Sequence, residues 1–203
     1  RDSEMSVDIH LYRRTPRIDF VADVDWQERQ TMAKIAFPVE VRSPAVTCEI
    51  QFGTVQRPTH RNTSWDEAKF EICAHHWIDL SEGGYGVSLL NDGRYGHDVV
   101  GNTLRLTALR GPEYPDPLAD LGMHRFGYAL LPHQGDWRQG ESVRRGWEFN
   151  APMAAVSSPG SGREGLAQPI VVEGKGLVVS ALKPALDGQG VIDEALNHHN
   201  ACC

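Results

Sequence analysis

The residues best suited to chemistry lie in one polar segment, residues 53–66, between two stretches of strand-like sequence. This segment carries Arg57, His60, Asn62 and Trp65 within a few positions of each other. An indole ring can stack on the C–H face of a sugar, while guanidinium and amide groups hydrogen-bond to hydroxyls. The segment therefore predicts a long polar loop that recognises a sugar. The alternative is a structural tryptophan that fixes the loop to the core.

A second candidate is Arg110, which follows the clearest alternating run of the chain, residues 103–109. Asp116 and Asp120 follow it in a proline-rich loop. A strand fixes the position of an arginine at its end, and nearby carboxylates can orient the guanidinium through charge-assisted hydrogen bonds. This arrangement predicts contact with a polar ligand. The alternative is a surface ion pair, which contributes little to stability.

The histidines and cysteines give weaker signals. His75 and His76 are adjacent in strand-like sequence, so one should face inward and the other outward, and they cannot bind one metal ion together. Residues 198–203 have the composition of a metal-binding tract, but a frayed terminus explains them as well. Cys48 and Cys73 are expected to be reduced, buried small residues. The sequence contains no phosphate loop, dinucleotide fingerprint or zinc-finger spacing.

Alternation of apolar and polar residues dominates the chain, as in half-buried strands. The expected strands cover residues 7–12, 18–21, 34–41, 47–52, 69–78, 84–90, 103–109, 125–131, 170–173 and 177–182. The last two are expected to pair as a hairpin, and only residues 135–150 carry a weak helical pattern. Strands at this spacing predict an all-β chain folded as a large antiparallel β-sandwich.

Composition narrows the functional class. The chain has 203 residues, of which 40% are hydrophobic and 23% charged, and this balance suits a globular protein. Its net charge is −7, and its basic residues form no stripe of the kind that binds nucleic acid. No apolar run could span a bilayer, and no leader-like segment supports secretion. The first residue is Arg1 rather than Met, which suggests a piece of a longer protein.

Several segments, taken in order, resemble the cytosolic and vacuolar α-mannosidases of glycoside hydrolase family 38. The matching segments are residues 49–53, 56–66, 70–71, 76–82, 84–92, 104–110, 120–122 and 128–133. Members of that family hydrolyse α-linked mannose with retention, using a zinc ion and an aspartate nucleophile. Both belong to an N-terminal α/β region, which is followed by a helical bundle and β-sheet domains. The resemblance implies that this chain is the large β-sandwich of the C-terminal half, a supersandwich of the galactose-mutarotase type.

The resemblance also implies that catalysis and substrate support belong to different regions of the parent enzyme. The catalytic residues and the zinc ion belong to the parent enzyme's N-terminal region, so this chain supplies neither a catalytic residue nor a metal site. An arginine at a strand end of the β region reaches the active site in related enzymes, and Arg110 is its match here. The expected substrate-binding or supporting residues are Arg110, Asp120, Arg57, His60, Asn62 and Trp65. The implied partners are the N-terminal catalytic domain, a mannoside or oligosaccharide substrate and further copies of the protein, in the cytoplasm and without nucleic acid or membrane.

The family pattern is lost at the end of the chain. Beyond residue 192 the family continues with a hydrophobic strand, whereas residues 193–203 are mostly polar. This departure predicts a sandwich over residues 1–192, truncated at its C-terminal end, and a disordered or non-native tail over residues 193–203.

Three interpretations remain open. The first is a fragment of a zinc-dependent, exo-acting α-mannosidase that completes and supports the active site. The second is a free-standing carbohydrate-binding β-sandwich without hydrolytic activity, and the third is a structural sandwich that mediates oligomer contacts. An upstream region with His-x-Asp zinc ligands would favour the first.

Overall fold

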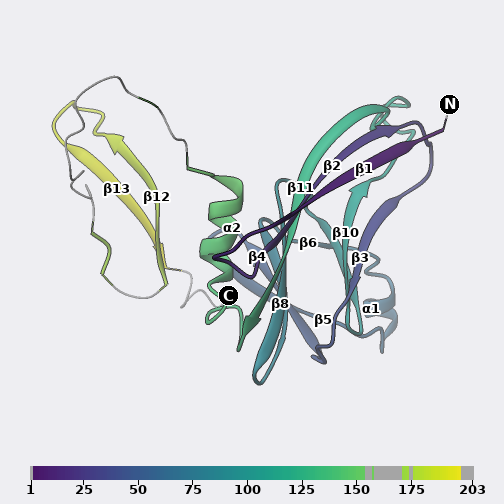
Figure 1. The fold of residues 1–203 in the computed structure, drawn as a ribbon, viewed down its shortest axis with the longest axis horizontal. Helices are drawn as coiled ribbons and strands as arrows, with labels where there is room; N and C mark the ends of the chain where they lie inside the picture. The colour runs from purple at the N-terminus through teal and green to yellow at the C-terminus, as the bar shows by residue number, and fades with distance from the viewer. Residues whose placement is uncertain (1, 154–156, 158–170, 174–175, 198–203) are drawn as a thin grey trace.

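The computed structural model describes residues 2–153, 157, 171–173 and 176–197, and these residues form mainly strands (Figure 1). The strands are β1 (Glu4–Leu11), β2 (Ile18–Trp26), β3 (Ala33–Pro38), β4 (Ala45–Ile50), β5 (Gly53–Pro58), β6 (Ile72–Cys73), β7 (Trp77–Glu82), β8 (Tyr85–Asn91), β9 (Gly96–Val100), β10 (Thr103–Leu109), β11 (Gly122–Gln134), β12 (Leu177–Pro184) and β13 (Val191–Asn197). The helices are α1 (Ser64–Glu67) and α2 (Ser142–Asn150).

These strands form two main sheets and a hairpin. The larger sheet has the order β1-β2-β11-β8-β7-β4-β5, the smaller one β3-β10-β9-β6, and β12 pairs with β13. Every strand pair is antiparallel. The predicted all-β fold, an antiparallel β-sandwich, is confirmed.

The main core lies between the two sheets, because alternate residues of each strand face the opposite sheet. Leu104 and Leu106 of β10 are fully buried, as is Leu89 of β8. Phe37 of the smaller sheet lies 5.6 Å from the ring of Phe20 in the larger sheet. The burial of these side chains sets the register of the strands, since a shift of one residue would turn them outward.

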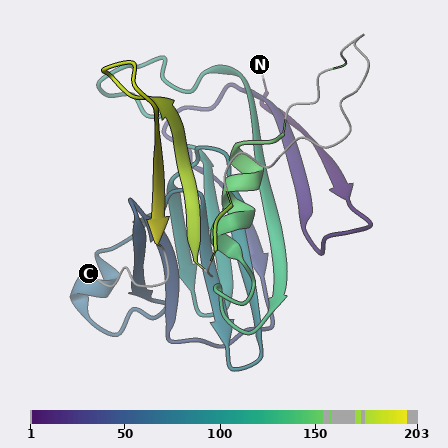
Figure 2. The ribbon, with the colours of Figure 1, turned by 90° about the vertical axis from the view of Figure 1, so that its left-hand side faces the viewer.

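A second, smaller core lies on the opposite face of the larger sheet, where α2 packs (Figure 2). Trp77 of β7 lies 5.4 Å from the ring of Trp137, and Val178 of β12 packs against the same cluster. Helix α2 approaches the sheet closely at Gly146. A Cβ at that position would lie 2.9 Å from Trp77 Cδ1 and 3.2 Å from His76 Cβ. The weak helical pattern of residues 135–150 thus predicted a real helix, which covers the second half of that range.

The expected run over residues 69–78 is not one strand. It is divided into β6 of the smaller sheet and β7 of the larger sheet. Between them, the Ala74 N–H donates to Tyr95 O at 3.1 Å, and the His75 N–H donates to Glu49 O at 3.1 Å. The backbone therefore changes hydrogen-bonding partner from one sheet to the other. His75 and His76 are both half-buried, and Cys73 is exposed, which corrects the expected in-and-out histidine pair and the expected burial of Cys73.

The C-terminal pairing also differs from expectation. Residues 171–173 are not in a strand, and β12 pairs with β13 rather than with them. Residues 193–197, expected to belong to a tail without regular structure, lie in β13. Residues 158–170 and 198–203 lie outside the described residues. The domain boundary at residue 192 stays a prediction.

Candidate functional site

The polar segment begins on a strand rather than in a loop. Residues 53–58 form β5, which pairs with β4 at the edge of the larger sheet. An edge strand can carry polar side chains on its solvent side, so its polarity concealed the strand in the sequence. Arg57 therefore stands on a strand opposite Val46, and its position is more rigid than that of a loop residue.

The segment lines a pocket of about 110 Å³ between the β5–α1 connection and β9. The charged and polar groups of its wall are Arg57, His60, Arg61, Asp66, Lys69 and Asp98. Val99 of β9 adds a buried apolar surface. The structure thus brings together two of the expected site residues, Arg57 and His60.

Short polar contacts fix the loop around this pocket. Thr63 caps α1 by accepting from the Asp66 N–H at 3.1 Å, and its hydroxyl donates to Asp66 Oδ2 at 2.8 Å. His60 Nδ1 lies 3.8 Å from the same carboxylate oxygen. At the start of the loop, the Thr59 hydroxyl donates to Ser43 O at 2.6 Å. These contacts hold the loop against the sheet edge without an aromatic anchor.

Asn62 and Trp65 are exposed and are not among the residues that line the pocket. Trp65 is 80% exposed. This exposure excludes the structural alternative, in which Trp65 fixes the loop to the core. Its indole face is open to solvent, as a sugar-stacking residue requires, while its role in sugar binding stays a prediction.

Arg110 directly follows β10, as expected, and its side chain is exposed. Asp120 does not orient the guanidinium. Its Oδ2 accepts instead from the backbone N–H groups of Arg110, at 3.0 Å, and Gly111, at 3.2 Å. Asp116 accepts from the Leu118 N–H at 2.9 Å. The acidic residues therefore shape the backbone at the strand end, because both fold back on their own loop.

The two groups of expected site residues do not form one site. Asp98 and Val99 of the pocket pair with Arg105 and Leu104 near the start of β10, whereas Arg110 follows its end. Five strand residues at about 3.3 Å each separate these levels by roughly 15 Å. Arg110 and Asp120 thus lie apart from Arg57 and His60.

A buried polar network that no sequence motif indicated lies beneath α2. Asp79 Oδ2 accepts from Ser88 Oγ at 2.7 Å and lies 2.7 Å from His133 Nε2. Ser88 Oγ also lies 2.7 Å from Ser142 Oγ at the start of α2. Burial lowers the pKa of His133, but the hydrogen bond and charge of Asp79 outweigh it, so the pKa lies above its ordinary value. The residues come from two distant parts of the chain, residues 79–88 and 133–142, so no local motif could have revealed the network.

Although it contains serine, histidine and aspartate, this network does not have the arrangement of a nucleophilic triad. In such a triad, the histidine stands between the serine and the carboxylate. Here Asp79 Oδ2, at 2.7 Å, and Ser88 Oγ, at 3.2 Å, both contact the same ring nitrogen of His133, Nε2, so the ring does not stand between them. Asp79 and Ser88 are also buried. The network instead joins α2 to β7, β8 and β11.

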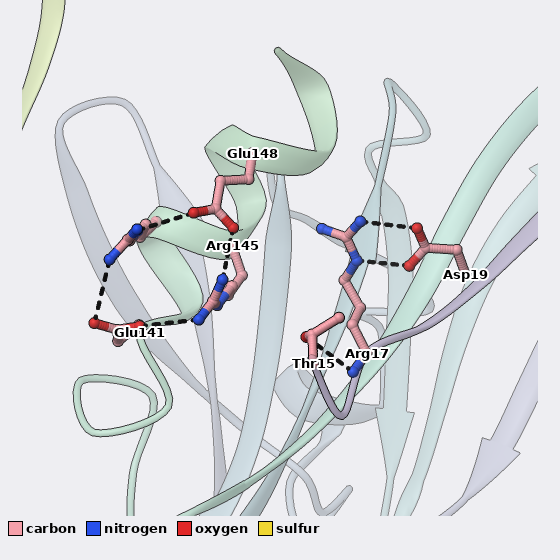
Figure 3. Close-up of polar contacts among 7 residues, drawn as sticks. Thr15, Arg17, Asp19, Glu141, Arg145 and Glu148 are labelled. Carbon is pink, nitrogen blue, oxygen red and sulfur yellow. Dashed lines mark hydrogen bonds and ion pairs between the residues drawn. The ribbon is translucent and has the colours of Figure 1, made fainter. Parts of the chain in front are cut away.

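Other charged groups near α2 are paired with each other (Figure 3). Arg17 binds Asp19 through two hydrogen bonds of 2.6 and 2.8 Å, and its guanidinium lies 5.3 Å from the Phe149 ring. Along α2, Arg145 pairs with Glu141 at 3.2 Å and with Glu148 at 2.8 Å. These pairs stabilise the face of α2 and the start of β2, and they leave no free charge for a ligand.

The described residues contain no group of three or more His, Cys, Asp or Glu side chains arranged to hold a metal ion. None of their helices is both long and apolar enough to cross a membrane.

Known proteins that are similar to this chain in sequence are named alpha-mannosidases. The alpha-mannosidase 2C1 of Mus musculus is 41% identical over 184 residues, which cover 91% of this chain and 18% of the mouse protein. The alpha-mannosidase 2C1 of Homo sapiens is 46% identical over 158 residues, covering 78% of this chain and 15% of the human protein. The chain therefore spans less than a fifth of the length of these relatives.

Comparison of structures leads to the same fold. An alpha-mannosidase from Enterococcus faecalis V583 superposes with a TM-score of 0.83 at 16% identity, over 98% of this chain and 24% of the bacterial one. The model of the glycosyl hydrolases family 38 C-terminal domain matches residues 1–118, more than half of the chain. This chain belongs to the family of glycosyl hydrolase family 38 C-terminal domains.

Proposed function

We propose that this chain is the C-terminal β-sandwich of a longer α-mannosidase that removes terminal α-linked mannose. The supporting observation is that relatives of 41% and 46% identity are named alpha-mannosidases and are much longer than the chain. In this proposal the hydrolysis is retaining and zinc-dependent. The nucleophile and the zinc ion belong to an N-terminal catalytic region in the cytoplasm, as the family resemblance implies.

The part played by zinc lies with that catalytic region. A bound zinc ion would supply Lewis-acid polarisation of the substrate. Zinc sites in enzymes use three or four protein ligands, and the described residues of this chain offer no such group. We therefore assign no step of the reaction to a metal held by this chain.

The role we assign to the chain is completion of the active site by Arg110. Asp120 fixes the backbone at the end of β10, and the Arg110 guanidinium is exposed and forms no ion pair with the described residues. Arginine keeps its charge at every working pH, and its fork can hold sugar hydroxyls or a neighbouring carboxylate in fixed geometry. Asp120 is then a positioning residue for Arg110.

Replacing Arg110 in the longer protein tests this role. Arg110→Ala should lower kcat/KM for an aryl α-mannoside by at least about tenfold, or about 1.4 kcal/mol of transition-state stabilisation. Arg110→Lys should recover only part of the activity, because lysine lacks the fork. The melting temperature should change little, since the side chain is exposed.

Arg125→Ala provides a matched control. Arg125 is also an exposed arginine, on β11, and it forms a surface ion pair with Asp23 at 3.0 Å. Its loss should leave kcat/KM unchanged and stability within about 1 kcal/mol. Near-normal kinetics of Arg110→Ala would mean that Arg110 does not contact the active site.

A second candidate function is carbohydrate binding without hydrolysis, and the exposed indole of Trp65 beside exposed Asn62 favours it. Adding an α-mannoside to the chain should then shift the NMR signals of residues 60–67, and Trp65→Ala should abolish those shifts. An unchanged spectrum together with self-association would favour the structural, oligomer-forming sandwich instead.

A further inference from the structure

In the pocket beside the β5–α1 connection, the carboxylates have hydrogen-bonding partners and most of the cations do not. Both carboxylates are already engaged: Asp66 accepts from Thr63 Oγ1 at 2.8 Å, and Asp98 accepts from Arg105 Nε at 2.6 Å. Asp98 also pairs with Lys34. The charge of Asp98 is therefore neutralised by cations outside the pocket, whereas Asp66 is held by the loop and keeps its negative charge.

The cations of the pocket have no such partners. Arg57, Arg61 and Lys69 form no ion pair with any residue of the described part of the chain. Arginine and lysine are charged at neutral pH, so three positive charges without an ion-pair partner line this small space, against the single negative charge of Asp66. His60, by contrast, lies 3.8 Å from Asp66.

Arg57 supplies a more specific observation. Its Nη1 atom is buried and has no hydrogen-bond partner among the described residues. Leaving a buried donor unsatisfied costs about 1–3 kcal/mol, and more for a charged group. A bound acceptor in the pocket would remove this cost, and β5 holds the guanidinium in place for it.

We propose that this pocket binds a phosphoryl group, either as free phosphate or as part of a sugar phosphate. A phosphate monoester carries a charge between −1.5 and −2 near pH 7 and has three acceptor oxygens, which suits three uncompensated cations. An arginine fork can bind two of these oxygens, and lysine can bind the third as a point charge. The site is separate from Arg110 and does not depend on the function proposed above.

Titration of the chain by calorimetry at low ionic strength tests the site. Inorganic phosphate should bind with a Kd below about 1 mM. Arg57→Gln, which removes the buried donor, should weaken binding by about tenfold or more. Lys69→Gln should also weaken binding, and because Lys69 is exposed this variant should fold normally. Arg14→Gln is the matched control, since Arg14 is an exposed arginine outside the pocket, and it should bind phosphate as the unaltered chain does.

Two further ligands distinguish the sources of the phosphoryl group. Tighter binding of mannose 6-phosphate than of phosphate would identify a sugar phosphate, while equal binding would identify free phosphate. Absence of binding by the unaltered chain would overturn the proposal. An equal loss of phosphate affinity in Arg14→Gln would also overturn it, because it would indicate only general charge attraction. Binding of uncharged mannose that is equally sensitive to Arg57→Gln would overturn it as well. None of these results depends on whether Arg110→Ala affects hydrolysis.

Discussion

The buried carboxylate of Asp79 shows how a single residue can join several elements of the fold. It is 1% exposed, and it accepts hydrogen bonds from Ser81 and Ser88, both at 2.7 Å. His133 Nε2 lies at the same distance. A buried charge is tolerated only where hydrogen bonds and an opposite charge compensate for its lost hydration.

Asp79→Asn should therefore destabilise the chain in a pH-dependent way. The folded-state pKa of His133 is raised, so the stabilisation from its protonated form is complete below about pH 6.5 and is lost as the pH rises through the folded-state pKa. We expect a loss of about 1.5–3 kcal/mol at pH 6 and a smaller loss at pH 9, from urea unfolding.

Asp23→Asn is the control for this prediction, because Asp23 forms an exposed ion pair with Arg125. It should cost less than about 1 kcal/mol at both pH values. An Asp79→Asn loss that is the same at pH 6 and pH 9 would show that His133 is not protonated by its contact with Asp79.

At the scale of elements, α2 is the feature that distinguishes this chain from a plain two-sheet sandwich. It covers Trp77, Leu90 and Ala129 on the outer face of the larger sheet, and Val178 extends the same cluster toward the β12–β13 hairpin. Figure 1 shows α2 between the sandwich and that hairpin. Through Val178, the hairpin therefore joins the same apolar cluster that α2 covers.

Gly146→Val should destabilise the chain by disturbing the packing of α2 against the larger sheet, and Arg144→Val controls for the effect of valine on the helix itself. The new side chain would lie against Trp77 and His76, and overpacking of this kind costs about 1–3 kcal/mol. Arg144→Val introduces the same residue on the exposed side of α2, where it removes surface ion pairs such as that with Glu148 at 2.9 Å. It should cost about 1 kcal/mol or less. Equal losses in urea unfolding would mean that α2 does not pack tightly at Gly146.

At the scale of the whole molecule, the chain corresponds to 18% of the length of its mouse relative. The seven-stranded sheet ends in β1, whose apolar side chains Met5, Val7, Ile9 and Leu11 are 37–74% exposed. These side chains lie on the same face of the larger sheet as the core residues of β2, because Met5 pairs with Val24 and Ile9 with Phe20. Their exposure shows that the smaller sheet does not cover this face at β1.

The isolated chain should not hydrolyse an aryl α-mannoside, with or without added zinc. Positioning by residues such as Arg110 accelerates a reaction only when a nucleophile is present to be positioned. The same assay on the protein joined to its upstream catalytic region should show turnover. Zinc-dependent hydrolysis by the purified chain, well above background, would refute the assignment of the reacting groups to another region.

The sequence by itself determined the fold class and the family. Period-two alternation is a local property of each strand, so residues 103–109 and 84–90 predicted strands that the structure contains. The motifs between residues 49 and 133 identified the family, and the weak pattern before residue 150 located α2. Arg110 was correctly placed at a strand end for the same reason, since the end of an alternating run is visible without tertiary information.

Only the tertiary structure decided which strands pair and which side chains meet. Polar residues conceal a strand at a sheet edge, as in β5, and backbone partners rather than side chains divided residues 69–78 between two sheets. Asp98 lines the same pocket as Arg57, 41 positions away, and His133 contacts Asp79, 54 positions away. Such contacts depend on how whole sheets pack against each other. Alternation shows which face of a strand is apolar, but it does not show which other strands cover that face.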